Sequence, residues 1–217
     1  MTKKEIQDGR EIKMKKGLFI TFEGVEGSGK STQIQKAAAF LRRRGVPVLV
    51  LREPGGTTIS EAIREILLDR KNNGMFPEPE LLLYLAARAQ ILREKIFPAL
   101  EKGTTVICDR FEDSTLAYQG FGRKMPIDSI REVSRLFARG NLVPDLTILL
   151  NIGTKEGMKR GGRHDRMERE SYLFHQKVHK GFLSLAKREP RRFAVIDSRL
   201  SIETVAGKVK EAFDRVL

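Results

Sequence analysis

The stretch GVEGSGKS, residues 24–31, decides the fold class of this 217-residue chain. It fits the pattern G-x-x-x-x-G-K-S/T of a phosphate-binding P-loop. The apolar run GLFITFE at 17–23 precedes it and predicts a buried strand, and a helical pattern from Lys30 to Gly45 follows it. The motif needs this context, because glycines let backbone N–H groups converge on phosphate oxygens while a helix N-terminus adds partial positive charge.

Most residues of this loop are expected to bind the phosphates of ATP. Lys30 can bridge the β- and γ-phosphates, and the Ser31 hydroxyl can bind Mg²⁺. Glu26 places a carboxylate beside bound phosphates, which is unfavourable unless it accepts a hydrogen bond from a sugar hydroxyl; an acid that faces solvent is the alternative. The predicted ATP-binding loop is Gly24, Val25, Glu26, Gly27, Ser28, Gly29, Lys30 and Ser31.

Outward from the loop, apolar runs alternate with helical patterns. Further strands are predicted at 47–53, 104–109, 145–152 and 192–197, and further helices at 60–70, 80–102, 127–139, 169–188 and 201–217. Strands that are apolar throughout are buried on both faces, which indicates a parallel sheet covered by helices. We therefore expect an α/β protein of the P-loop NTPase fold: a five-stranded parallel sheet with helices on both faces, and ligands at the carboxyl ends of the strands.

The composition of the chain limits which classes of protein it can belong to. Hydrophobic residues make up 40% of the chain, but no apolar run approaches the roughly 18 residues of a membrane span. Residues 1–15 are polar and predict a flexible extension without a secretory signal, and residues 16–217 predict one domain. One cysteine excludes an intrachain disulfide, so a cytoplasmic protein is expected. The net charge of +13 fits either nucleic acid or substrates that carry several phosphates.

Arginines at strand ends suggest a second anion site. Arg52 ends the second predicted strand, and Arg110 follows Asp109 at the end of the third. Arg88 lies four residues after Tyr84, so both project from one face of a helix. A guanidinium donates two parallel hydrogen bonds to a phosphate, and a carboxylate at the end of an apolar strand can hold Mg²⁺ through water. A surface salt bridge, a core tyrosine and a capping aspartate are the ordinary alternatives.

Six stretches of the sequence, in the same order along the chain, resemble those of bacterial thymidylate kinases. The matching stretches, spread over about residues 17–217, are FEGVEGSGKST, REPGGT, LYLAAR, DRFEDSTLAYQG, NLVPDLTILLNI and GGRHDRME. The spacing D-R-F-x-x-S-T-x-A-Y-Q is the most specific of them. The resemblance implies a homodimeric enzyme that transfers the γ-phosphoryl group of ATP to dTMP with Mg²⁺, giving dTDP and ADP for dTTP synthesis.

The resemblance also implies roles for single residues. Glu26 approaches the deoxyribose, Tyr118 packs beside the sugar and Gln119 lines the same pocket. Tyr84 stands where the family usually has a phenylalanine that stacks on thymine, so its hydroxyl needs a partner. The implied dTMP site is Glu26, Arg52, Tyr84, Arg88, Arg110, Thr115, Tyr118 and Gln119, with Arg52 and Arg110 at the phosphate and with Arg88 and Thr115 at the base edge; Ser31 and Asp109 form the Mg²⁺ site.

A lid is expected at 159–168, the stretch KRGGRHDRME. Some members of the family carry a catalytic arginine within the P-loop, but the variable positions of this loop hold none. The lid therefore resembles the type that supplies the arginine itself, and Arg163 is predicted to act with Lys30 and Arg110. Arg166 is assigned to the ATP site, with a tie to acidic neighbours as its alternative.

Two other functions stay open. One is another nucleoside monophosphate kinase on the same fold. The other is a P-loop ATPase that acts on nucleic acid, whose turnover DNA would stimulate. The sequence offers no groove-reading motif, so ATP and dTMP are the expected partners and nucleic acid and membrane are not.

Overall fold

The structure, a computed structural model, describes residues 6–7, 10–11, 17–161 and 165–217. Near the N-terminus, β1 (Ile6–Gln7) and β2 (Arg10–Glu11) pair in antiparallel register. Most of the segment predicted to be a flexible extension lies outside the described residues, so that expectation stays a prediction.

The main sheet confirms the predicted parallel architecture. Its strand order is β4-β5-β3-β6-β7, and every neighbouring pair is parallel. Within the described residues its five strands are β3 (Phe19–Glu23), β4 (Val48–Arg52), β5 (Thr105–Asp109), β6 (Leu146–Asn151) and β7 (Phe193–Asp197). The central strand β3 lies where the strand order reverses, which is where open α/β sheets bind their ligands.

Helices fill the connections. In chain order they are α1 (Lys30–Arg43), α2 (Thr58–Leu68), the 3₁₀ turn η1 (Arg70–Asn72), α3 (Pro77–Ile91), η2 (Leu92–Ile96), α4 (Phe97–Glu101), α5 (Glu112–Thr115), η3 (Leu116–Gly122), α6 (Ile127–Ser134), η4 (Arg135–Arg139), α7 (Thr154–Arg160), α8 (Tyr172–Arg188) and α9 (Ile202–Phe213). The predicted helix 80–102 corresponds to α3, η2 and α4, and it begins three residues early because Pro77 occupies the first turn. The segments η2, η3 and η4 are π-helical, which helical periodicity alone did not predict.

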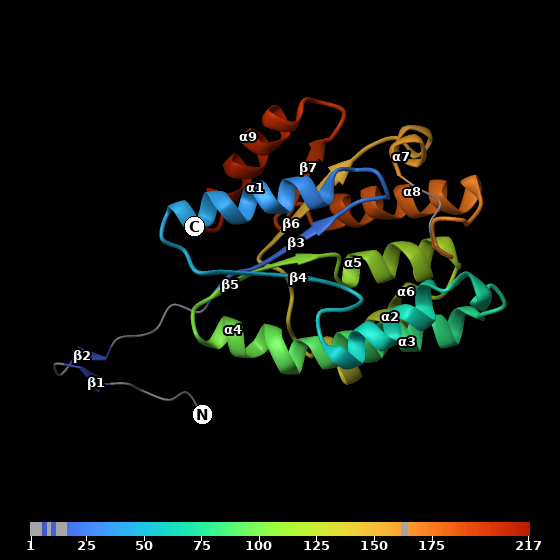
Figure 1. The fold of residues 1–217 in the computed structure, drawn as a ribbon, viewed down its shortest axis with the longest axis horizontal. Coiled ribbons are helices and arrows are strands. Elements are labelled where there is room, and N and C mark those ends of the chain that lie inside the picture. Colours follow the sequence, from blue (N-terminus) through green and yellow to red (C-terminus); the bar gives the residue numbers. More distant parts are fainter. Residues whose placement is uncertain (1–5, 8–9, 12–16, 162–164) are drawn as a thin grey trace.

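The core has a layer on each face of the sheet. Figure 1 shows α1 and α9 on one side, and α2, α3 and α4 on the other. Ile20 and Phe22 of β3 pack with Ile34 of α1 on the first side, whereas Phe19 packs with Ile91 on the second. All five residues of β3 are buried, as expected of a strand that is covered on both faces.

The functional residues gather at one end of the sheet. The P-loop follows β3 and Arg110 follows β5, both at carboxyl ends.

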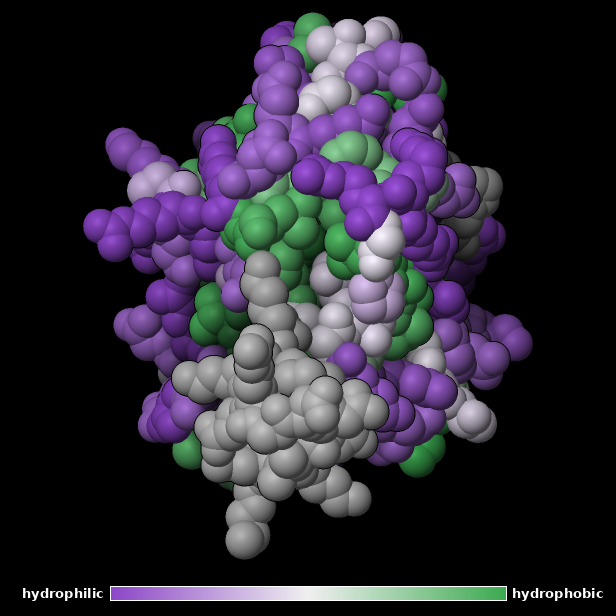
Figure 2. All heavy atoms as spheres, turned by 90° about the vertical axis from the view of Figure 1, so that its left-hand side faces the viewer, coloured by the Kyte–Doolittle hydropathy of each residue, from purple (hydrophilic) through white to green (hydrophobic). Residues whose placement is uncertain are grey.

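The opposite side of the molecule, at which the strands begin, is shown in Figure 2. Hydrophilic residues surround a smaller hydrophobic area there. No helix in the described part of the chain combines the length and the apolar composition that a membrane span requires.

Candidate functional site

The loop between β3 and α1 has the shape of an anion cradle. Gly24, Gly27 and Gly29 have φ angles of 140°, 70° and 86°, which glycine adopts at little cost. Lys30, the first residue of α1, is buried, and its Nζ donates to the carbonyl oxygens of Gly24 at 3.1 Å and Val25 at 3.2 Å. The ammonium group is therefore held within the loop, and its predicted contact with the β- and γ-phosphates stays a prediction.

Helix α7 lies directly against this loop. A Cβ atom on Gly27 would collide with the carbonyl oxygen of Gly157, and one on Gly157 would lie 2.7 Å from the carbonyl oxygen of Glu26. Glycine at both positions thus permits contact between the P-loop and α7. The segment predicted to be the lid therefore begins on a helix that rests on the P-loop.

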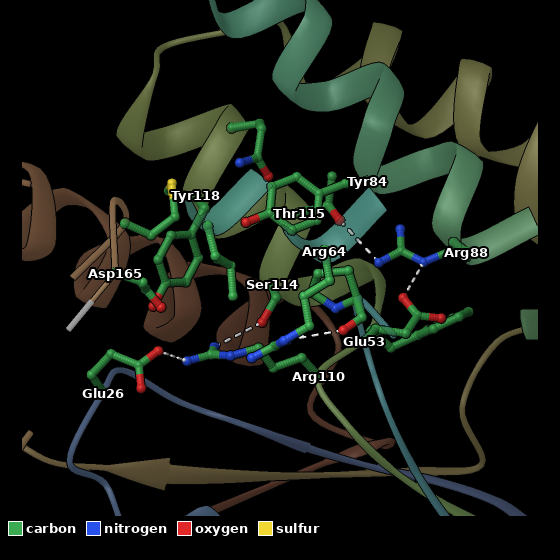
Figure 3. A pocket seen from close by; sticks show the side chains of 15 residues that line it. Glu26, Glu53, Arg64, Tyr84, Arg88, Arg110, Ser114, Thr115, Tyr118 and Asp165 are labelled. Carbon is green, nitrogen blue, oxygen red and sulfur yellow. Dashed lines mark hydrogen bonds and ion pairs between the residues drawn. The ribbon is translucent and has the colours of Figure 1, made fainter. Parts of the chain in front are cut away.

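Arg110 joins the P-loop to the neighbouring pocket. It has a φ of 69°, which is uncommon outside glycine and often marks a functional position. Its Nη1 donates to the carbonyl oxygen of Gly24 and to Ser114 Oγ, each at 3.0 Å, and its Nη2 forms an ion pair with Glu26. Its guanidinium carbon lies 5.3 Å from the ring centre of Tyr118, within cation–π distance. Figure 3 shows Arg110 between Glu26 and Ser114.

Glu26 is ionised at neutral pH. Burial raises the pKa of its carboxyl group, but attraction to Arg110 and Lys30 outweighs burial and holds this pKa at about 2. A charged carboxylate at this place can accept a hydrogen bond from a ligand hydroxyl. The ion pair with Arg110 explains how an acid is tolerated inside a phosphate-binding loop.

A pocket opens beside the P-loop and contains seven of the eight residues that sequence analysis assigned to the acceptor. The lining residues are Glu26, Glu53, Pro54, Arg64, Leu68, Tyr84, Arg88, Arg110, Phe111, Ser114, Thr115, Tyr118, Gln119, Asp165 and Met167. Figure 3 shows Glu26 and Arg110 toward one end and Arg88 with Thr115 toward the other. One end of the pocket thus lies next to the P-loop. At the other end, Arg88 is hydrogen-bonded to Glu53 and Thr115.

The far end of the pocket is built around Arg88. Its Nε donates to Glu53 at 2.7 Å and its Nη2 donates to Thr115 Oγ1 at 3.0 Å. The side chains of Arg88 and Glu53 are buried, and Arg88 Nη1 has no hydrogen-bond partner among the described residues. A buried donor without a partner favours a ligand that brings an acceptor to this place.

The structure places Arg52, the eighth predicted residue, outside the lining of this pocket. Its side chain is 51% exposed and its Nη2 pairs with Glu61 at 2.7 Å. Arg64 of α2 lines the pocket instead, with Nη1 donating to the carbonyl oxygen of Pro54 at 2.9 Å. Sequence analysis missed Arg64 because a single arginine on an amphipathic helix carries no local signal.

The predicted lid arginines lie in different surroundings. Arg166 is buried: its Nη1 pairs with Glu80 at 2.6 Å and its Nε donates to the carbonyl oxygen of Leu67 at 2.9 Å. These contacts turn it toward α2 and α3 and do not support its assignment to ATP; they match the alternative, a tie to an acidic residue. Arg160 pairs with Glu156. Arg163 lies outside the described residues, and its catalytic role stays a prediction.

Glu23, the last residue of β3, was also missed. It is fully buried and accepts hydrogen bonds from Phe111 N at 2.8 Å, Ser114 N at 3.3 Å and Ser114 Oγ at 2.6 Å. Burial, followed by the charge of Asp113, raises its pKa to about 8. The carboxyl group ties β3 to the turn that carries Arg110. A charged residue that closes an apolar strand was a signal that could have identified it.

Asp109 and Ser31 fit a site for a divalent cation that phosphate also binds. Asp109 ends β5, and its Oδ1 is buried without a hydrogen-bond partner among the described residues. Ser31 is exposed at the start of α1. The described part of the chain holds no cluster of three or more His, Cys, Asp or Glu residues that could bind a metal by itself. Mg²⁺ commonly takes one or two protein ligands together with phosphates and water, which this arrangement allows.

Comparison with known proteins gives a consistent result. The family model of thymidylate kinase matches residues 22–209. The thymidylate kinase of Geobacter sulfurreducens is 53% identical over 204 residues, covering 90% of this chain and 95% of that protein. That of Thermoanaerobacter sp. strain X514 is 48% identical, covering 93% of this chain and 100% of that protein. A solved structure of thymidylate kinase from Ehrlichia chaffeensis superposes with a TM-score of 0.75 at 32% identity, covering 92% of this chain and 99% of that one. The chain therefore belongs to the thymidylate kinase family.

Proposed function

We propose that this chain transfers the γ-phosphoryl group of ATP to dTMP, giving dTDP and ADP for dTTP synthesis. The observation that carries this is the position of Arg110, which contacts the P-loop at the Gly24 carbonyl oxygen and lines the adjoining pocket. A guanidinium at that place can contact the acceptor phosphate while the P-loop holds the donor. The two phosphates would then meet at one arginine, which would hold the acceptor oxygen close to the γ-phosphorus.

The remaining residues fit roles in binding and orientation. Lys30 and the backbone N–H groups of the P-loop bind the donor phosphates, and Arg110 with Arg64 binds the acceptor phosphate. An oxygen of the dTMP phosphate attacks the γ-phosphorus while the bond to the ADP oxygen breaks. Glu26 accepts a hydrogen bond from the sugar, and Tyr84 faces the base. Arg163 of the lid remains our candidate for the arginine that stabilises the transition state.

The site also fits Mg²⁺. Ser31 would bind the ion directly and Asp109 would hold it through water, which would give its Oδ1 the partner that the described residues do not supply. When bound, Mg²⁺ neutralises the charge that develops on the phosphates. We also propose a cytoplasmic location, with which the single cysteine of the chain is compatible.

Acceptor specificity provides the test of the proposed function. The wild-type protein is expected to use dTMP better than dUMP by about 10–200-fold in kcat/KM, because one methyl group in an apolar pocket discriminates only modestly. AMP and GMP should be much poorer acceptors. A coupled assay of ADP release over dTMP, dUMP, dCMP, AMP and GMP measures this. Equal kcat/KM for dTMP and AMP would contradict the assignment of the pocket.

We further propose a homodimer, which exposed apolar side chains support. They lie on α2, α3 and η4, and α3 packs against both of the others. The residues are Ile59, Ile66, Leu82, Leu136 and Phe137, between 46% and 73% exposed. Exposed apolar side chains gathered on neighbouring helices favour an interface between proteins. A second copy of the chain would cover them.

The oligomeric state is expected to depend on this surface. Sedimentation of the wild-type protein should give the mass of two chains, and the double variant Leu82→Glu and Phe137→Glu should give the mass of one, because two carboxylates would be buried unpaired. The control is Glu211→Gln, which changes an exposed carboxylate on α9, outside the proposed interface. This variant should remain a dimer. A monomeric wild type at micromolar concentration would contradict the proposal.

A further inference from the structure

Glu80 of α3 is a buried carboxylate to which no role was assigned from the sequence, and its partner Gln119 lines the acceptor pocket. Its exposed fraction is 0%. Its Oε1 accepts from Gln119 Nε2 at 2.9 Å and from Arg123 Nε at 3.1 Å, and its Oε2 accepts from Arg123 Nη2 at 2.9 Å and Arg166 Nη1 at 2.6 Å. Burial raises the pKa of Glu80, but hydrogen bonds from Arg123, Gln119 and Arg166 outweigh burial and lower it. Glu80 is therefore ionised.

An ionised carboxylate fixes which end of the Gln119 amide faces it. Carboxylate oxygens only accept hydrogen bonds, so the amide must present its NH₂ group to Glu80. The carbonyl oxygen of Gln119 is then the atom left to act as an acceptor. Because Gln119 lines the pocket, this oxygen is available to a hydrogen-bond donor on a ligand.

The neighbouring groups of the pocket present donors. Thr115 Oγ1 already accepts from Arg88 Nη2, so its hydroxyl hydrogen is free to be donated. Arg88 Nη1 is buried without a partner among the described residues. The end of the pocket thus combines donors from Arg88 and Thr115 with an acceptor from Gln119.

This combination matches one class of pyrimidine. Thymine and uracil present carbonyl oxygens beside a ring N3–H, which is an acceptor next to a donor. Cytosine presents an amino group beside a ring nitrogen without a hydrogen, which is the reverse order. A carbonyl oxygen of Gln119 would therefore face a hydrogen in the first case and a lone pair in the second.

We propose that Glu80 sets the base specificity of the pocket by locking Gln119 as an acceptor, so that the pocket selects a pyrimidine whose ring N3 carries a hydrogen. Glu80 is a positioning residue, since it acts through Gln119. This inference rests on the proposed function, because it assumes that the pocket binds the acceptor base. Replacing Glu80 by glutamine would let residue 80 donate as well as accept, so that Gln119 could turn over and lose its fixed orientation.

The two arginines that pair with Glu80, Arg123 and Arg166, also have other partners. Arg123 also pairs with Glu170 at 2.6 Å and lies 4.7 Å from the ring centre of Phe174. Arg166 keeps its hydrogen bond to the carbonyl oxygen of Leu67. Both arginines therefore retain contacts without the charge at position 80.

The experiment compares kcat/KM for dTMP, dUMP and dCMP in the wild type, Glu80→Gln, Gln119→Met and the double variant. The matched control is Glu78→Gln, an exposed carboxylate two residues earlier on the same helix. The dTMP-to-dCMP ratio should fall about tenfold in each single variant, as expected for one hydrogen bond. The double variant should fall no further, because both changes remove the same discrimination. The dTMP-to-dUMP ratio should stay constant, since both bases carry N3–H.

Each other result has a definite meaning. If Glu80→Gln lowers kcat/KM equally for dTMP and dCMP, Glu80 only supports the structure and the proposal is wrong. If Glu80→Gln does not fold, which its thermal melting curve would show, Gln119→Met decides alone: an unchanged dTMP-to-dCMP ratio would overturn the proposal and a lowered one would support it. A wild type that does not phosphorylate dTMP would overturn the proposed function, whereas normal dTMP turnover with unchanged ratios in the variants would overturn only this inference.

Discussion

Removing divalent cations with EDTA is expected to abolish phosphoryl transfer, and adding Mg²⁺ is expected to restore it. The protein supplies cationic groups at the P-loop, Lys30 and Arg110, but the triphosphate of ATP brings more negative charge than these two neutralise. The buried Oδ1 of Asp109 has no partner among the described residues and lies at the strand end next to Arg110. The initial rate of ADP formation at saturating ATP and dTMP, before and after chelation, measures the effect.

The same interpretation gives Asp109→Asn a smaller effect. We expect a loss of about 10–100-fold in kcat, the range for residues that hold a metal through water, with the melting temperature close to that of the wild type. Asp128→Asn, an exposed carboxylate at the start of α6, is the matched control and should keep full activity. Turnover that continues without any divalent ion would contradict the roles assigned to Ser31 and Asp109.

The parts of the fold that the sequence predicted are those with a local physical cause. Strands of a parallel sheet that helices cover are largely apolar, so β3 to β7 stood out as runs, and glycines marked the P-loop. The edge strand β4 is largely apolar in sequence although none of its residues is fully buried. The π-helical segments were not predicted, because periodicity did not reveal where one extra residue enters a helix. The short helix α5 depends on Glu23, which accepts from its first turn and lies 91 residues from Ser114 in sequence. A contact of that length leaves no periodic pattern.

The site divides in the same way. Residues 24–31 and 109–119 are contiguous motifs, and the structure brings them together through the contacts of Arg110 with Gly24 and Glu26. Arg64 enters the pocket because α2 packs beside α3, and Glu80 meets Arg166 across 86 residues. Ion pairs such as these depend on the packing of whole helices. The sequence predicted side chains that line the pocket, such as Arg88 and Thr115, better than it predicted the buried ion pairs that hold them in place.

Replacing Arg110 with alanine is expected to raise KM for dTMP far more than KM for ATP. Arg110 lines the acceptor pocket and donates a hydrogen bond to the carbonyl oxygen of Gly24 in the P-loop. No other side chain among the described residues makes both contacts, so the variant would lose this link between the pocket and the P-loop. By analogy with a buried charge pair that loses one member, the cost is about 2–5 kcal/mol, which corresponds to roughly 30- to 5,000-fold in KM for dTMP. Steady-state kinetics with each substrate varied in turn measures both constants.

The control for this prediction is Arg52→Ala. Arg52 was also assigned to the acceptor phosphate, but its side chain is half exposed and pairs with Glu61 outside the pocket. A screened surface ion pair contributes little, so we expect Arg52→Ala to raise KM for dTMP much less than Arg110→Ala does. If Arg110→Ala raises both KM values equally, Arg110 supports the P-loop as a whole through its bonds to Gly24 and Glu26, and the acceptor phosphate must be bound by another residue. If Arg52→Ala has the larger effect, Arg52 must leave Glu61 and turn into the pocket when dTMP binds, and the assignment drawn from the sequence would hold against the arrangement in this structure.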